Sequence, residues 1–322
     1  MSREPAAATA TPPARPGRAH LLLIVNPRAS RLRPRELEAV GDALRATFGV
    51  STVRTEGPGH ATQLAREAAD GGYDAVAVVG GDGTGSEAAA GLMGSETPMA
   101  CLPAGCTNVF ARSIGTLRDP VAAARRLAAR PLAPRSIDLG TVNGRPFLSA
   151  SGIGFSASMS AAADRAPDRK ARLGQLHFTV TGLSELGSRY LRRPPRMRIE
   201  VEGRSAHAIT AIIQNSHVLT YFGPREITVC EGAGYETGSL SLTLLRRAGP
   251  RDVPSVVARL VTGSASAVTA HPQAESLPDL REAVVYADDD DAPLPLEADG
   301  EYLGLHRRIA YGVAPAALRV LA

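Results

Sequence analysis

The amino-acid sequence predicts an α/β plus β protein, in which an N-terminal parallel-sheet domain is followed by a β-sandwich-type domain. Three observations lead to this prediction. The chain has 322 residues, more than a single domain usually contains. Helical and extended patterns alternate before residue 130, and such alternation gives a parallel sheet covered by helices. From about residue 131 the pattern changes to short extended runs separated by turn signals.

The N-terminal part begins with a segment that has no hydrophobic periodicity. Residues 1–18 are rich in Ala, Pro, Thr and Arg, and we predict that they form a disordered tail. The α/β domain is predicted over 19–130, with a C-terminal return of the chain over 306–322. Compact apolar runs predict its strands, and amphipathic patterns predict its helices. The strands are expected at 20–25, 50–55, 74–79 and 99–102, and the helices at 34–48, 62–69, 86–93 and 121–129.

The second domain is predicted over 131–305 and is rich in strands. Asn143-Gly144 predicts a hairpin turn, because this dipeptide favours the positive φ angles of type I′ turns. One inserted helix is expected at 173–190, and the acidic run 288–291 is expected to be a solvated loop. Extended runs are expected at 136–142, 146–150, 197–201, 208–215, 240–245 and 283–286.

Composition narrows the classes of partner. The net charge of +4 favours anionic partners, including nucleotides and acidic lipid surfaces. Aromatic residues make up only 4% of the chain and tryptophan is absent, so we expect no nucleic-acid partner. The longest apolar run is too short to cross a bilayer, and three cysteines are too few for a disulfide framework. We therefore expect a soluble, cytoplasmic protein.

A glycine-rich turn is the first motif that carries chemistry. A short β-branched strand leads into Gly80-Gly81-Asp82-Gly83-Thr84-Gly85, and a helical pattern starts near Ser86. Glycine permits positive φ and lets backbone N–H groups approach an anion, while the following helix contributes its positive end. The turn therefore predicts a phosphate ligand, and a simple glycine turn remains the alternative.

Three further blocks accompany this turn in a fixed order. They are Asn26-Pro27, the segment 102–112 with sequence LPAGCTNVFAR, and Asp299-Gly300-Glu301. Together with Gly152-Ile153-Gly154-Phe155, these blocks resemble the diacylglycerol kinase catalytic family over roughly residues 20–320. That superfamily includes sphingosine kinases and, more distantly, NAD kinases and 6-phosphofructokinases. The resemblance implies an NAD kinase/phosphofructokinase-like nucleotide-binding domain, with ATP and Mg²⁺ as cofactors.

The resemblance also implies which residues line the nucleotide site. Single residues have structural alternatives: Asn26 could cap a turn, Glu87 could favour a helix start, and Asn108 could be an N-cap. The implied nucleotide-binding residues are Asn26, Gly80, Gly81, Gly83, Thr84, Glu87, Gly105, Cys106 and Asn108.

Carboxylates supply the catalytic roles that phosphoryl transfer needs, namely a metal ligand and a proton acceptor. The resemblance brings Asp82, Asp299 and Glu301 into one cleft. We expect Asp299 to be the base, with Asp82 and Glu301 organising the metal, and the reverse assignment of the two aspartates stays open. From spacing alone, Asp299-Gly300 would instead be a type I′ hairpin turn.

The acceptor is expected from a departure within the family pattern. Ser156 and Ser158 stand where many relatives carry an aspartate for the lipid head group. An amino-bearing head group would lose an ionic partner there, which favours diacylglycerol as substrate and phosphatidic acid as product. The expected partner is therefore a lipid at a membrane surface, reached by peripheral association.

Other departures keep alternatives open. Ser86 replaces a frequent Asn, Cys106 a usual Thr or Ser, and Val109 an Asp. The open alternatives are a sphingoid-base or other lipid kinase, a soluble-substrate kinase of the NAD kinase type, and a nucleotide-binding module that has lost catalysis. A homodimer also stays open. Basic residues at 165–172 and 189–198 could contact phosphates or an anionic membrane.

Overall fold

The structure is a computed structural model that describes residues 17–29, 33–164, 194–247, 249, 252–262, 264–288 and 292–322. The helix expected at 173–190, nearly all of the expected tail and most of the acidic run 288–291 lie outside the described residues. The same holds for the basic residues at 165–172 and for Arg189, Arg192 and Arg193.

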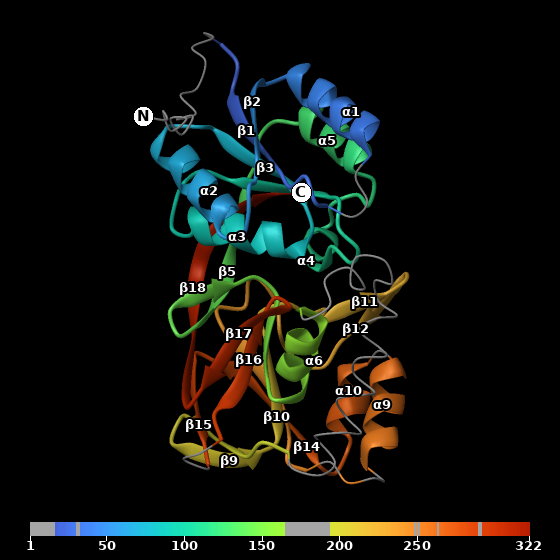
Figure 1. The fold of residues 1–322 in the computed structure, drawn as a ribbon, viewed down its shortest axis with the longest axis vertical. Helices are drawn as coiled ribbons and strands as arrows, with labels where there is room; N and C mark the ends of the chain where they lie inside the picture. Colours follow the sequence, from blue (N-terminus) through green and yellow to red (C-terminus); the bar gives the residue numbers. More distant parts are fainter. Residues whose placement is uncertain are drawn as a thin grey trace, which may run out of the picture.

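The N-terminal half is a parallel sheet between two layers of helices (Figure 1). Its parallel strands lie in the order β2-β1-β3-β4. These strands are β1 (His20–Val25), β2 (Gly49–Arg54), β3 (Ala75–Gly80) and β4 (Met99–Pro103). The helices are α1 (Pro34–Arg45), α2 (His60–Asp70), α3 (Asp82–Leu92), α4 (Val109–Ser113) and α5 (Pro120–Ala128).

Two hydrophobic cores fill the two faces of this sheet. Successive side chains of a strand point to opposite faces. Accordingly, Leu22 and Ile24 of β1 pack with residues of α2 and α3, whereas Leu21 and Leu23 pack with residues of α1 and α5. Burial on both faces explains why β1 reads as a continuous apolar run.

The second half is built from antiparallel strands that pack as two sheets. Within the described residues, a six-stranded sheet has the order β14-β13-β10-β7-β16-β17. Its strands are β7 (Ala150–Ile153), β10 (Thr210–Gln214), β13 (Leu240–Leu245), β14 (Ala274–Leu280), β16 (Leu294–Ala298) and β17 (Glu301–His306). A third hydrophobic core, which includes Ile153, Ile213 and Leu242, joins it to the opposing strands.

The opposing strands continue the sheet of the N-terminal half. They are β5 (Arg135–Val142), β6 (Arg145–Phe147), β8 (Met197–Val201), β9 (Arg204–Ala208), β15 (Glu282–Ala287) and β18 (Arg308–Leu321). The remaining elements are α6 (Phe155–Asp164), β11 (Thr220–Phe222), β12 (Arg225–Ile227), α9 (Asp252–Thr262) and α10 (Ala265–Thr269). None of the described helices is long and apolar enough to cross a membrane.

The long strand β18 ties the two halves together. Its first residues pair with β15, and residues from Tyr311 to Val320 pair with β5. Val320 and Leu321 also pair in parallel with β4. A bulge between Ala314 and Leu318 interrupts the ladder where Pro315 lies. The buried Asp138 of β5 accepts a hydrogen bond from Ala316 N at 2.8 Å, which holds this bulge in place.

The fold class predicted from the sequence is confirmed, with differences in single elements. The turn at Asn143-Gly144 is confirmed by φ angles of 48° and 79°. The helix expected from residue 86 begins earlier, at Asp82, because an acidic residue suits a helical first turn and glycine also tolerates helical geometry. The helices α4, α6, α9 and α10 and the strand β14 were not predicted. The helices α4 and α10 have five residues each, which is too few to show a helical period.

Candidate functional site

The glycine-rich turn lies where β3 ends and α3 begins, at the carboxyl edge of the parallel strands. A Cβ atom added to Gly105 would lie 2.5 Å from Gly81 Cα, and one added to Gly80 would lie 2.7 Å from Thr84 Cβ. None of the glycines at 80, 81, 83 and 85 has a positive φ. The expected need for positive φ is therefore wrong here. Close backbone approach explains the glycines at 81 and 105, and the side chain of Thr84 explains the glycine at 80.

Asn26 and Thr84 join the first block of sequence to the glycine turn. The amide Nδ2 of Asn26 donates to Thr84 Oγ1 at 2.8 Å, and its Oδ1 accepts from Arg28 N at 2.9 Å. Asn26 N donates to Val79 O. Asn26 thus caps its own turn, which was the structural alternative for this residue. It also fixes the hydroxyl of Thr84.

Asn108 holds the neighbouring loop closed. It adopts the left-handed conformation with a φ of 51°, and its side chain accepts from Gly105 N at 2.9 Å and donates to Gly105 O at 2.8 Å. It occupies the N-cap position of α4 but makes no capping hydrogen bond with its side chain. Cys106 lies within this closed loop, and its thiol is exposed.

Asp82 lies in the first turn of α3 and faces the start of α4. Its Oδ1 accepts a hydrogen bond from Phe110 N at 3.1 Å. The pKa of Asp82 is raised to about 6. Burial is the main cause, the N–H of Phe110 opposes it, and the charge of Asp299 adds to it. The two aspartates are therefore close enough to interact, although 217 positions separate them in the sequence.

Asp299 lies in a tight turn between β16 and β17. The φ angles of Asp299 and Gly300 are 49° and 81°, as a type I′ turn requires, and the flanking residues Ala298 and Glu301 are paired. The hairpin turn and the site are thus the same feature. The turn directs the carboxylate of Asp299 toward the N-terminal half.

Four donors surround the carboxylate of Asp299. Its Oδ1 accepts from Ser149 N at 2.7 Å and from Ala150 N at 3.2 Å. Its Oδ2 accepts from Leu148 N at 2.7 Å and from Ser86 Oγ at 2.6 Å. The backbone at the start of β7 and just before it therefore fixes the orientation of the Asp299 carboxylate.

Ser86 is the residue that joins the two halves at this point. It lies four positions after Asp82 on α3, so both side chains lie on one face of the helix. Its hydroxyl donates to Asp299 across the boundary between the halves. Ser86 thus connects the glycine turn to the distant hairpin. In the sequence it stood out only because it replaces a frequent Asn.

The other predicted residues have mainly structural partners. Glu87 Oε2 accepts from Ala61 N at 3.2 Å, at the start of α2. Glu301 is exposed and pairs with Arg145 at 2.5 Å. Ser158 is buried in α6, and Gly83 is exposed.

Glu297 is a buried carboxyl that the sequence did not single out. Its Oε2 accepts from Gly300 N at 2.9 Å and so supports the turn that carries Asp299. Its Oε1 lies over Gly152, beside the hydroxyl of Ser156. Burial raises the pKa of Glu297 to about 8, with a contribution from the charge of Asp299. In the sequence, only its position two residues before Asp299 could have indicated it, because side chains two apart on a strand lie on the same face.

Tyr235 is a second residue that the sequence did not indicate. Its ring meets Phe110 edge to face at 5.6 Å, and its hydroxyl lies 3.2 Å from Ser149 Oγ. Burial is the main cause that raises its pKa above the usual value for tyrosine, and the charges of Asp299 and Asp82 add to this. Tyr235 thus packs behind both aspartates as a neutral phenol.

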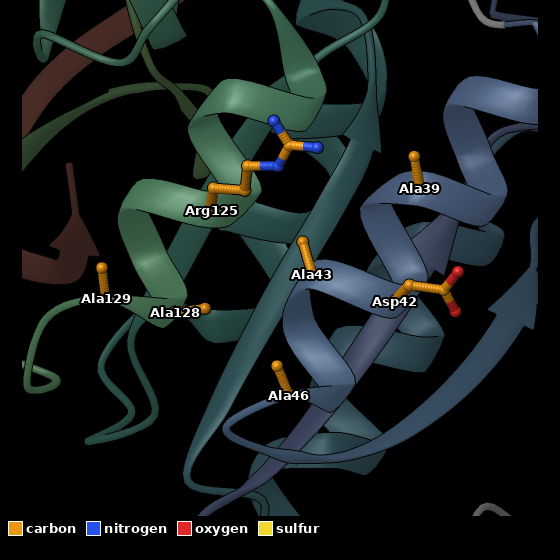
Figure 2. A pocket seen from close by; sticks show the side chains of 7 residues that line it. All are labelled: Ala39, Asp42, Ala43, Ala46, Arg125, Ala128 and Ala129. Carbon is orange, nitrogen blue, oxygen red and sulfur yellow. The ribbon is translucent and has the colours of Figure 1, made fainter.

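Two hollows differ in their chemistry. A narrow space beside the glycine turn is lined by Gly81, Asp82, Asn108 and Phe110, among others. A wider, shallow hollow of about 500 Å³ lies between α1 and α5 and is lined mostly by alanines (Figure 2). Its one carboxylate, Asp42, pairs with Arg45. The alanine-lined hollow offers little for a polar ligand, so the candidate site is the one at Asp82.

The arrangement of the carboxylates suits a metal ion that binds together with the substrate phosphates. It suits a metal ion held by protein ligands alone less well. In the described part of the chain, no three His, Cys, Asp or Glu residues are grouped as metal ligands. Asp299 accepts four hydrogen bonds and Glu301 is paired with Arg145. Mg²⁺ is commonly held by one or two carboxylates together with substrate phosphates and water, and Asp82 could supply one such ligand.

Comparisons with known proteins place the chain in a family with two domains. The diacylglycerol kinase catalytic domain family matches residues 20–142, and the YegS C-terminal NAD kinase beta sandwich-like domain matches residues 151–322. A diacylglycerol kinase of Bacillus subtilis is 34% identical over 162 residues, which cover 50% of this chain and 52% of that protein. A Pseudomonas putida protein named "Probable lipid kinase YegS-like" is 38% identical over 149 residues, covering 45% and 48%.

Solved structures match over nearly the whole chain. A crystal structure of a diacylglycerol kinase from Bacillus anthracis has a TM-score of 0.67 at 17% identity, covering 95% of this chain and 97% of that one. Another chain from the same organism has a TM-score of 0.75 at 21% identity, covering 96% of both. At these identities the likeness concerns the fold.

The sequence matches are more limited in length, since the chain spans about half the length of the curated relatives it matches. The two family domains nevertheless follow one another along the chain, and the second alone covers more than half of it. The chain therefore belongs to the family of lipid kinase-like proteins that combine a diacylglycerol kinase catalytic domain with a YegS C-terminal NAD kinase beta sandwich-like domain.

Proposed function

We propose that this protein transfers the γ-phosphate of ATP to the hydroxyl of a membrane lipid, with diacylglycerol as acceptor and phosphatidic acid as product. The observation that carries the proposal is the pairing of two carboxylates from different halves of the molecule. Asp82 lies in the glycine turn, and Asp299 comes from a distant hairpin to meet the same face of α3. Such a pair suits phosphoryl transfer, which depends on positioning and on a proton acceptor.

The nucleotide phosphates would bind at the glycine turn. The close approach of Gly81 and Gly105 brings two loops together, and the first turn of α3 directs backbone N–H groups outward from that point. Thr84, held by Asn26, would contact the phosphates. When bound, Mg²⁺ would offset the charge on the phosphate oxygens.

The hydrogen bonds favour Asp82 as the proton acceptor. Protonating Asp299 would disrupt at least one of the four hydrogen bonds that its carboxylate accepts. Burial raises the pKa of Asp82 to about 6 although the N–H groups of Phe110, Val109 and Asn108 lower it, and this value is close to the operating range of a general base. We therefore propose the reverse of the expected assignment: Asp82 takes the proton, and Asp299 fixes Ser86 and the hairpin against α3.

A neutral acceptor is favoured by the surroundings of Ser156. The carboxyl of Glu297 lies beside this serine, and burial raises the pKa of Glu297 to about 8. Glu297 is therefore mostly uncharged near neutral pH and gives little attraction to an ammonium group. This supports diacylglycerol over a sphingoid base.

The test is transfer of radiolabel from γ-labelled ATP to a panel of lipids in mixed micelles. Diacylglycerol should be labelled, while sphingosine and NAD should not. Asp82→Asn should reduce kcat by at least about a hundredfold, since general base catalysis contributes on that order. Asp42→Asn, in an exposed ion pair on α1, is the matched control and should leave transfer unchanged.

The outcomes separate the alternatives. Labelling of NAD alone would support a soluble-substrate kinase and overturn the lipid proposal. Binding of ATP without transfer to any acceptor would instead support a nucleotide-binding module that has lost catalysis. If Asp299→Asn abolished transfer while Asp82→Asn retained most of it, the assignment of the base would revert to Asp299.

A further inference from the structure

The hairpin of β11 and β12 exposes an aromatic side chain at its tip. Phe222 is 64% exposed, whereas its neighbour Tyr221 is buried against Val109 and Val218. Side chains alternate along a strand, so Phe222 points to the opposite face from Tyr221. Its cross-strand partner is Arg225, which therefore shares the outer face.

The tip is a tight turn of fixed shape. The two residues between the strands are Gly223, whose φ is 60°, and Pro224, whose ring fixes a negative φ. A glycine with positive φ at the first central position is the pattern of a type II′ hairpin turn. The exposure of Phe222 is thus built into the hairpin.

A second exposed apolar side chain lies next to this tip. Four large hydrophobic side chains among the described residues are strongly exposed, and Leu117 is one of them at 41%. Leu117 precedes Arg118, whose Nη2 donates to Gly223 O at 3.2 Å. The loop after α4 and the tip of the hairpin therefore form one surface, as their proximity in Figure 1 also indicates.

Cationic groups surround these apolar side chains. Arg112 stacks on the ring of Tyr221 at 3.3 Å and donates to Gly223 O at 3.3 Å, so it shares this acceptor with Arg118. The two guanidinium groups repel each other, and an anion beside them would relieve that repulsion. Arg225 adds a third arginine on the outer face. Glu226 and Asp82 act on Arg112, and the exposed Asp119, which caps α5, follows Arg118.

We infer that Arg112, Leu117, Arg118, Phe222 and Arg225, here called the docking edge, bind the surface of an anionic lipid bilayer. Exposed apolar side chains among arginines match the boundary between acyl chains and anionic head groups. The inference rests on the proposed function, because it names how the enzyme reaches its lipid.

The position of the docking edge suits that role. The helix α4 begins beside Asp82, where Phe110 N donates to the carboxylate, and Arg112 lies one turn or less further along. A bilayer held at the docking edge would therefore lie near the carboxylates. A single exposed aromatic ring is poorly suited to the stacked bases of a nucleic acid, for which several rings are usual.

The inference is tested by flotation of the full chain with vesicles, in the absence of ATP. The vesicles contain phosphatidylcholine with or without phosphatidylglycerol. The wild type should float with the anionic vesicles, and Phe222→Ser should bind about tenfold more weakly, since an exposed aromatic ring loses its insertion. Arg118→Gln should weaken binding about fivefold and reduce its dependence on salt.

Matched controls occupy another part of the surface. Leu305 is 56% exposed on β17, and Arg307 is exposed in the following turn. Leu305→Ser and Arg307→Gln should therefore bind the anionic vesicles as the wild type does. Because all four positions are exposed, thermal melts should show that the variants fold.

Kinase assays keep the two proposals apart. A short-chain diacylglycerol that is dispersed in water needs no docking, so Phe222→Ser should phosphorylate it at the wild-type rate. If the wild type labels this substrate but Phe222→Ser and Arg118→Gln float as well as the wild type, the docking edge is wrong and the kinase proposal stands. If flotation depends on these residues and no lipid is labelled, the surface stands and the kinase proposal fails. Equal loss of flotation in all four variants would also overturn the docking edge.

Discussion

At the scale of single residues, Asp82 and Asp299 differ in how their oxygens are engaged. Asp299 is held by three backbone N–H groups and the hydroxyl of Ser86. Asp82 accepts from Phe110 N and lies where burial disfavours its charge. The same residue type therefore serves two roles, because the surroundings determine which carboxylate exchanges a proton readily.

The first prediction concerns the pH dependence of catalysis. Burial raises the pKa of Asp82 to about 6, so the basic form is lost as the pH falls through that value. With saturating ATP, kcat should therefore fall about tenfold per pH unit below about pH 6. A profile that stays flat down to about pH 4 would contradict Asp82 as the base.

The second prediction concerns the hydrogen bond from Ser86 to Asp299. Ser86→Ala leaves one oxygen of a partly buried carboxylate without its hydroxyl donor, so the free energy of unfolding should fall by about 1–2 kcal/mol. Because the hairpin loses its tie to α3, kcat should fall while the KM for ATP stays nearly constant. Ser86→Asn keeps a donor and should recover much of kcat. Equal kinetics for all three proteins would show that the contact has no role in positioning.

At the scale of elements, the glycine turn depends on contact between two backbones. A Cβ at Gly105 would lie 2.5 Å from Gly81 Cα, a backbone atom that can move only together with its loop. At Gly83 the same atom would meet open space, on the exposed side of α3. A side chain is therefore excluded at Gly105 but has room at Gly83, although the two glycines belong to neighbouring motifs.

The third prediction compares alanine at these two positions by chemical denaturation. Gly105→Ala should lower the free energy of unfolding by about 2 kcal/mol or more, because the backbone must shift. Gly83→Ala should raise it by about 0.5–1 kcal/mol, because alanine favours the helix. The same sign for both changes would contradict the close approach of the two loops.

How far the sequence leads is also decided at the level of elements. The strands β1, β3 and β4 were predictable because burial on both faces gives unbroken apolar runs. The short helix α4 was not predictable, since five residues are too few to show a helical period. The ties from Asp299 to Leu148, Ser149 and Ala150 involve backbone N–H groups, which every residue type offers. No side-chain pattern could therefore have indicated them.

At the scale of the whole molecule, the two halves share both a sheet and a site. The strand β18 begins beside β15 and ends beside β4, so the second half cannot move far from the first without breaking this ladder. The Ser86–Asp299 contact lies across the same boundary. The hairpin that carries Asp299 is supported from within the second half by Glu297. The stability of the fold and the geometry of the site are therefore coupled through the carboxyls of Asp299 and Glu297.

The last prediction is that alkaline pH weakens this arrangement. The pKa of Glu297 is about 8 in the folded protein and 4.5 as its ordinary value, so between these limits the folded state binds more protons than the unfolded state. The free energy of unfolding should then fall as the pH rises from about 5 to about 8, by up to about 1.4 kcal/mol per pH unit from this group. Glu297→Gln keeps an acceptor for Gly300 N but cannot ionise, so denaturation at several pH values should give it a shallower slope than the wild type. Glu38→Gln, at an exposed position of α1, is the control and should keep the wild-type slope. If Glu297→Gln and the wild type lose stability in parallel, Glu297 is charged in the folded protein, and the argument for a neutral acceptor loses its support.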